Sequence, residues 1–179
     1  MTPIIRTLLI VIMIVASNVV AIAQQPNRQQ RVSREQLAEI EFSKETFVND
    51  VMSLPYRKAT IPGYGDKASL VIYLHGGTSK GDDNEAQMQE PGISAIASWL
   101  SANNYKSIML VPQCPTDKAW LGTTQDVLVA LLKTYIDRGV ADADKVYIFG
   151  GSMGGTGTWG MLSNHSDLFA AAMPVAGNP

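Results

Sequence analysis

From residue 69 onward, short apolar runs alternate with segments in which apolar residues recur at helical spacing. Runs of this length that are apolar throughout are typical of strands buried on both faces. Buried strands separated by helices predict a parallel sheet of right-handed βαβ units. The fold class is therefore α/β, with a doubly wound and mostly parallel sheet. The predicted strands are 69–77, 107–113, 145–151 and 170–177, and the predicted helices are 93–100, 127–135 and 153–162.

The first 23 residues have the pattern of a cleaved secretory signal. Arg6 precedes the apolar run 8–16, and Ala21-Ile22-Ala23 supplies the small residues that signal peptidase reads. A transmembrane anchor is the alternative, but it needs about 20 apolar residues and this run is shorter. We therefore expect cleavage after Ala23, a secreted or periplasmic protein that starts at Gln24, and no stable membrane anchor.

Residues 24–50 are predicted to be a polar lead-in followed by a short helix. The lead-in is polar and lacks periodicity, and Ser33 then begins a capping box that Leu37, Ile40 and Phe47 follow at roughly helical spacing. The run 54–62 predicts an early strand that ends in a turn at Pro62-Gly63.

Residues 51–179 are predicted to form the sheet domain, but only its N-terminal portion. The last predicted strand reaches residue 177, and a doubly wound sheet places a crossover helix after such a strand. We therefore expect the C-terminal part of this domain to lie outside the chain.

Composition narrows the classes of partner. The chain has 179 residues and a net charge of −2, which does not favour a nucleic-acid surface or a polybasic membrane patch. Cys114 is the single cysteine, so no intrachain disulfide can form. We expect it to be a packing residue, because no histidine or helix start adjoins it in sequence to activate a thiol nucleophile.

Residues 150–154 form a G-x-S-x-G motif between a predicted strand and a predicted helix. In that setting a strained turn exposes the serine, and its glycine neighbours avoid clashes with the adjoining strand and helix. The helix start also offers backbone N–H groups to a developing oxyanion. Ser152 is therefore a candidate nucleophile. The alternative is a glycine-rich turn whose serine only caps the helix.

A second glycine motif, His75-Gly76-Gly77, ends the first long apolar run. In hydrolases with the serine motif, one oxyanion donor is the N–H after the nucleophile, here that of Met153. The other comes from the loop after an earlier strand, often marked by an HG sequence. Gly77 is the predicted second donor, and the alternative is an ordinary turn that needs glycine.

Several blocks of the sequence resemble one superfamily. They are LVIYLHGG, KGDDN, VPQCP, DKVYIFGGSMGGTGTW and HSDLFAAAMPVAGNP. Across residues 54–179 they resemble α/β-hydrolases of the serine esterase, phospholipase/carboxylesterase and polyhydroxybutyrate-depolymerase type, which include prolyl-oligopeptidase-like and dienelactone-hydrolase-like members. The resemblance implies the α/β-hydrolase fold and no cofactor. It also implies Ser152 as the nucleophile and an oxyanion hole shaped by Gly77 and Met153.

The resemblance also implies a triad in the chain order Ser, Asp or Glu, His. After Ser152 the sequence offers His165 and Asp167, but a helix of about 12 residues would carry His165 roughly 18 Å away. His75 lies in the oxyanion-loop motif, which the family uses structurally. We expect neither histidine to serve Ser152, and the triad acid and base to lie outside this chain.

Three further motifs or residues can be explained without an additional binding site. The G-x-G-x-x-G match at 155–160 starts inside a predicted helix and lacks the acid about 20 residues on, so it does not indicate a dinucleotide site. Asp82, Asp83 and Glu85 lack the ligand spacing of a calcium loop, so we expect a solvated loop and no metal. Trp120 suits the entrance to a substrate cleft or plain packing equally well.

Three hypotheses about function follow. The first is a secreted serine hydrolase that cleaves a small-molecule or polymeric carboxylic ester through an acyl-enzyme on Ser152, in the complete protein. The second is a peptidase of the prolyl-oligopeptidase-like type, because the same motif serves amides. The third is a non-catalytic remnant or binding module that lacks a complete triad. The 179 residues alone are expected to be inactive.

The N-terminal prediction is tested by sequencing exported protein. The first residue should be Gln24, because the Ala-x-Ala site directs cleavage after Ala23. Membrane-bound protein with Met1 still in place would contradict it and indicate an anchor.

Overall fold

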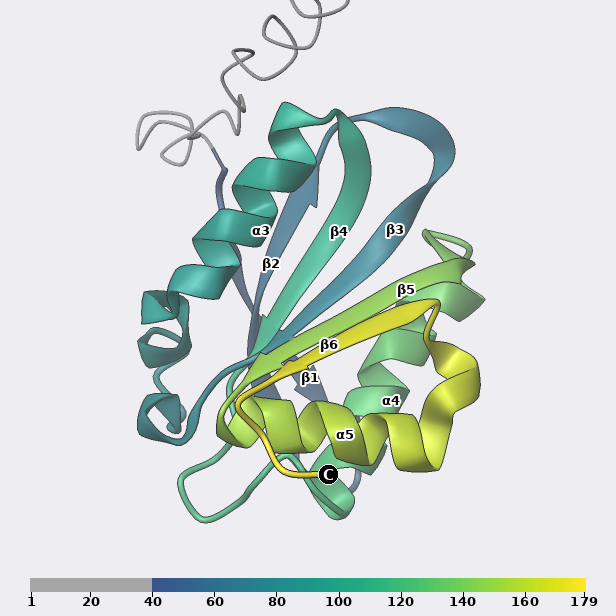
Figure 1. The fold of residues 1–179 in the computed structure, drawn as a ribbon. Helices are drawn as coiled ribbons and strands as arrows, with labels where there is room; N and C mark the ends of the chain where they lie inside the picture. The colour runs from purple at the N-terminus through teal and green to yellow at the C-terminus, as the bar shows by residue number, and fades with distance from the viewer. Residues whose placement is uncertain (1–39) are drawn as a thin grey trace, which may run out of the picture. The chain divides into compact units, whose positions relative to one another are not determined.

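The computed structural model describes residues 40–179, which form a six-stranded sheet flanked by helices (Figure 1). The strand order is β1-β2-β4-β3-β5-β6. The strands are β1 (Ser43–Val48), β2 (Ser53–Ile61), β3 (Tyr64–Leu74), β4 (Tyr105–Pro112), β5 (Ala141–Gly151) and β6 (Ala171–Val175). The helices are α3 (Pro91–Ala102), α4 (Thr123–Asp137) and α5 (Met153–His165), with short 3-10 turns η1 (Gly77–Ser79), η2 (Ala86–Gln89) and η3 (Ser166–Leu168).

The sheet is mostly parallel. Strands β4, β3, β5 and β6 run parallel, while β2 is antiparallel to both β1 and β4. This confirms the predicted α/β class with a mostly parallel sheet, and every predicted strand and helix from residue 69 onward is present near its predicted bounds. The long central strand β3 pairs with β4 on one side and β5 on the other, so its last seven residues are all buried.

Helices cover both faces of the sheet. Helix α3 lies on one face, and α4 and α5 lie on the other (Figure 1). Successive residues of β3 supply the two cores in turn, because side chains of a strand alternate between faces. Leu70 and Ile72 belong to the core under α4 and α5, whereas Val71 and Tyr73 belong to the core under α3. Among residues 40–179, no helix is long and apolar enough to cross a membrane.

The predicted short helix before residue 50 is wrong over residues 43–48, which form β1. Phe47 lies opposite Leu54 in the antiparallel ladder with β2 and packs against the larger core. Pairing with a distant strand thus outweighs the weak helical spacing of the segment. The predicted boundary at residue 51 therefore falls inside the sheet. The predicted signal (1–23), the polar lead-in and the predicted capping box at Ser33 lie outside the described residues.

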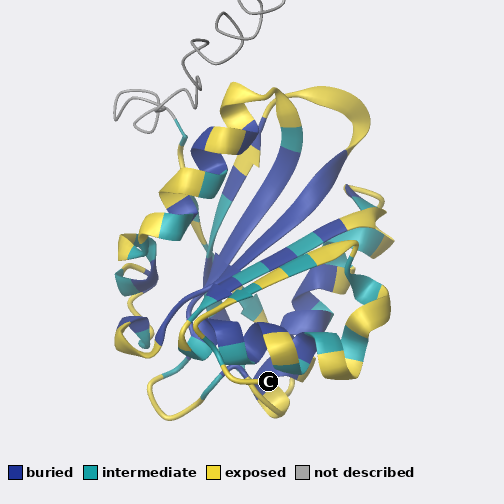
Figure 2. Ribbon diagram, in the orientation of Figure 1, coloured by how far each residue is buried: buried dark blue, intermediate teal, exposed yellow. Residues whose placement is uncertain are grey.

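Two apolar surfaces remain open in the described part of the chain. Strand β6 is an edge strand whose Met173 and Val175 are about half exposed (Figure 2). On the α3 face, an apolar hollow of about 500 Å³ lies between Trp99 of α3 and the side chains of Tyr147 and Phe149 on β5. Helix α3 thus covers only part of its face of the sheet.

Candidate active site

Ser152 occupies the tight turn between β5 and α5. Its backbone has φ 54° and ψ −117°, a conformation that residues with a side chain rarely adopt. Its N–H donates to the carbonyl of Val175 at 2.9 Å, and its carbonyl accepts the N–H of Thr156 at 3.0 Å. The residue is exposed. The strained turn is therefore held from both sides and presents Ser152 to solvent.

Two glycines of the motif are required by close backbone contacts. A Cβ on Gly154 would lie 1.9 Å from the carbonyl oxygen of Leu74, at the end of β3. A Cβ on Gly150 would lie 2.2 Å from the carbonyl oxygen of Gly154. Real Cβ atoms do not tolerate such distances, so only glycine lets the start of α5 pack directly on β3. This is the packing that the G-x-S-x-G motif predicted.

The loop after β3 lies beside the serine. A Cβ on Gly76 would be 3.7 Å from the Cβ of Ser152. The N–H groups of Gly77, which follows in this loop, and of Met153, at the start of α5, have no hydrogen-bond acceptor among residues 40–179. The two predicted oxyanion donors are therefore on the two segments that border Ser152, with their N–H groups available. Their role stays a prediction.

His75 is engaged by the backbone through both ring nitrogens. Its Nε2 accepts the N–H of Cys114 at 2.9 Å, so Nδ1 carries the proton and donates to the carbonyl of Gly76 at 2.6 Å. Burial lowers the pKa of His75, against a smaller opposing effect of its bond to Gly76. The side chain is fully buried and neutral at ordinary pH, so it is not placed to take a proton from Ser152.

His165 is the last residue of α5, whose first residue follows Ser152. At 1.5 Å per residue, a helix of this length spans about 18 Å. That distance is far beyond hydrogen-bond reach, and Asp167 lies further along the chain in η3. The structure therefore brings neither of the chain's two histidines to Ser152.

Cys114 and Trp120 have packing roles. Burial raises the pKa of the Cys114 thiol to about 11, so it is protonated and unreactive at neutral pH. Trp120 is also buried, and its Nε1–H donates to the carbonyl of His75 at 3.0 Å. Trp120 does not line a cleft. The glycines of the 155–160 match lie inside α5, not at a strand end, where a dinucleotide site would need them.

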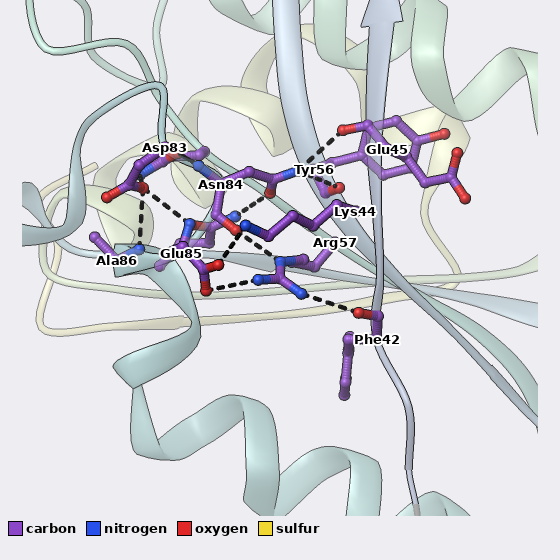
Figure 3. A network of polar contacts seen from close by, with 11 residues as sticks. Phe42, Lys44, Glu45, Tyr56, Arg57, Asp83, Asn84, Glu85 and Ala86 are labelled. Carbon is purple, nitrogen blue, oxygen red and sulfur yellow. Dashed lines mark hydrogen bonds and ion pairs between the residues drawn. The ribbon is translucent and has the colours of Figure 1, made fainter.

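The acidic loop at residues 82–85 is built into the fold by hydrogen bonds and ion pairs (Figure 3). Asp83 accepts the side-chain N–H of Gln113 at 2.7 Å, and Glu85 pairs with the guanidinium of Arg57 at 2.7 Å. The buried Asn84 donates to the backbone carbonyls of β1 and β2. Asp82, Asp83 and Glu85 are all exposed, as the prediction of a solvated loop requires, and Asp83 and Glu85 are in addition anchored to the fold by these bonds. Within residues 40–179 no cluster of side chains suits a metal ion.

Glu90 was not among the predicted site residues. Its Oε1 accepts the N–H of Gly76 at 3.0 Å and the hydroxyl of Ser79 at 3.2 Å. Its place before Pro91 marks a helix start in the sequence. No sequence pattern indicates that its side chain reaches back to the loop after β3.

Comparison with known proteins agrees with this geometry. Residues 116–178 match the prolyl oligopeptidase family. A thermostable esterase is 26% identical over 77% of the chain, with a TM-score of 0.63. The chain has the α/β-hydrolase fold. The family match covers residues 116–178 only, and the similarity to the esterase extends over most of the chain.

Two more distant structures share the fold alone. The feruloyl esterase module from Clostridium thermocellum is 18% identical over 78% of the chain, with a TM-score of 0.61. The Pyrococcus horikoshii acylaminoacyl peptidase is 22% identical over 77% of the chain, with a TM-score of 0.54. The chain spans 41% of the length of the thermostable esterase, 54% of the feruloyl esterase module and 23% of the peptidase. No curated protein sequence matches it significantly.

The backbone contact at Gly154 generates a prediction with a matched control. Gly154→Ala should lower the free energy of unfolding by about 3 kcal/mol or more, because its Cβ would overlap the Leu74 carbonyl. Gly77→Ala should leave it nearly unchanged, because its Cβ would meet nothing within 4 Å. Urea unfolding, followed by far-ultraviolet circular dichroism, measures both free energies. Equal midpoints for the two variants would contradict the tight packing of α5 on β3.

Proposed function

We propose that this chain carries the nucleophile and the oxyanion hole of a secreted or periplasmic serine hydrolase that cleaves carboxylic esters. The observation that carries the proposal is the conformation of Ser152, at φ 54° between β5 and α5. A strained, exposed serine at this position is typical of the nucleophile in α/β-hydrolases. The adjoining N–H groups of Gly77 and Met153 would stabilise the oxyanion that forms during the reaction.

In the proposed reaction, the Ser152 hydroxyl oxygen attacks the carbonyl carbon of the ester, and its proton passes to a general base. The N–H groups of Gly77 and Met153 donate to the oxygen that becomes negative in the tetrahedral intermediate. Each such donor contributes about 3–4 kcal/mol to lowering the barrier. Collapse of the intermediate releases the alcohol, which takes the proton from the base, and leaves the acyl group on Ser152. Water then hydrolyses this acyl-enzyme with the help of the same base.

The general base and its acidic partner are proposed to come from residues outside these 179. Support comes from the two histidines, since His75 is engaged through both ring nitrogens and His165 is about 18 Å along α5. The similar solved structures are also longer than the chain. Without a base, Ser152 stays a protonated alcohol at neutral pH.

Esters are the preferred substrate class because two of the similar structures are named esterases. A small-molecule or polymeric ester agrees with the expected export of the protein. Amides are the second candidate, since residues 116–178 match the prolyl oligopeptidase family and an acylaminoacyl peptidase shares the fold. Turnover of p-nitrophenyl acetate against that of an aminoacyl p-nitroanilide separates the two. Turnover of neither would favour the non-catalytic remnant.

The nucleophile is tested in a version of the protein that continues past Pro179 and includes the base. Ser152→Ala should lower kcat for p-nitrophenyl acetate by at least about 10³-fold, because no acyl-enzyme can form. Its circular dichroism should match that of the parent. Ser163→Ala is the control, because Ser163 is an exposed serine of α5 that bonds only the carbonyl of Trp159. Parental turnover by Ser152→Ala would refute the assignment.

A further inference from the structure

Glu90 directs its carboxylate away from its own helix and towards the loop after β3. It occupies the N-cap position of α3 but makes no capping bond to that helix. Its Oε1 instead accepts the backbone N–H of Gly76 at 3.0 Å and the hydroxyl of Ser79 at 3.2 Å. One carboxylate oxygen thus holds two points of the loop that contains the predicted donor Gly77.

Glu90, Gly76 and Ser152 converge within a small space. A Cβ on Gly76 would lie 3.3 Å from Oε1 of Glu90 and 3.7 Å from the Cβ of Ser152. Gly76 therefore lies directly between the carboxylate of Glu90 and the side chain of Ser152. A shift of the Glu90 side chain would move the loop directly beside the candidate nucleophile.

The carbonyl of Gly76 is also engaged. The carbonyl of Gly76 accepts both the ring N–H of His75 at 2.6 Å and the N–H of Ser79 at 3.3 Å. With the N–H of Gly76 bonded to Glu90, the peptide groups on both sides of Gly76 are fixed. The N–H of Gly77, on the next peptide group, has no acceptor among residues 40–179.

The start of α3, from which Glu90 reaches, is itself held in place. A Cβ on Gly92 would lie 2.6 Å from the ring of Tyr73, so the first turn of α3 packs directly on this buried β3 side chain. Burial raises the pKa of Tyr73, and the nearby charge of Glu90 adds a smaller effect in the same direction. Glu90 thus projects from a rigid support and not from a loose loop.

We propose that Glu90 is a positioning residue of the oxyanion hole, which fixes the Gly76 peptide so that the N–H of Gly77 faces the acyl oxygen. The inference rests on the proposed function of Ser152. The role of Glu90 is geometric and not electrostatic, because a negative charge beside a developing oxyanion would oppose catalysis. A neutral side chain of the same length, with an oxygen in the same place, should therefore replace it.

The test uses the active protein that continues past Pro179. Glu90→Ala should lower kcat for p-nitrophenyl acetate about 10- to 100-fold with KM within about 3-fold of the parent, because misplaced donors act on the transition state. Its affinity for a trifluoromethyl ketone, which forms a tetrahedral oxyanion on serine, should fall by the same factor as kcat/KM. Glu90→Gln should stay within about 3-fold of the parent in kcat/KM and in its affinity for the ketone. Asp82→Ala, which removes an exposed acid, should change neither kcat/KM nor the affinity for the ketone.

Hydrogen exchange at the Gly76 amide gives a second readout that does not need activity. Exchange should be slow in the parent and in Glu90→Gln, and faster in Glu90→Ala. Parental kcat and parental exchange in Glu90→Ala would overturn the proposal, as would a Glu90→Gln variant as impaired as Glu90→Ala. If the parent hydrolyses no ester, or Ser152→Ala keeps its rate, the proposed function fails and the oxyanion-hole role of Glu90 fails with it, whereas exchange at Gly76 still shows whether Glu90 holds that peptide group.

Discussion

The direct backbone contact between the start of α5 and the end of β3 is the constraint on which the site depends. Gly154 lies against the carbonyl of Leu74, at a distance that leaves no room for a Cβ. This contact sets the turn at Ser152 and brings the loop after β3 next to it. The serine, the predicted oxyanion donors and the helix start therefore share one small region of the sheet edge.

His75 ties three segments together behind this region. Its ring bonds the backbone of Gly76 and Cys114, and its carbonyl accepts the indole N–H of Trp120. A fully buried, neutral imidazole serves this purpose because it can donate and accept at once. The same engagement explains why a histidine so near in sequence to the oxyanion loop is unsuited to be the base. The loop is thus held by His75 on one side and by Glu90 on the other.

Periodicity and motif placement predicted the features that depend on local sequence. The strands from residue 69 onward, the three helices and the turn at Ser152 belong to this group, because burial on both faces leaves continuous apolar runs. Strand β1 was missed because its ladder with β2, and not its own spacing, determines its conformation. The side-chain contacts of Glu90 with the loop after β3, and of Asp83 with Gln113, were missed for a related reason. They join residues far apart in sequence through side-chain reach, which no short pattern records.

The central claim is that the chain presents an activatable serine but does not contain its base. Labelling with a fluorophosphonate, followed by mass spectrometry of the Ser152 peptide, tests it most directly. We expect the 179-residue chain to label slowly or not at all, and a version that continues past Pro179 to label rapidly at Ser152. Rapid, stoichiometric labelling of Ser152 in the 179-residue chain would contradict the account, because a base would then lie within it. Labelling of the longer version at another residue would contradict the choice of nucleophile.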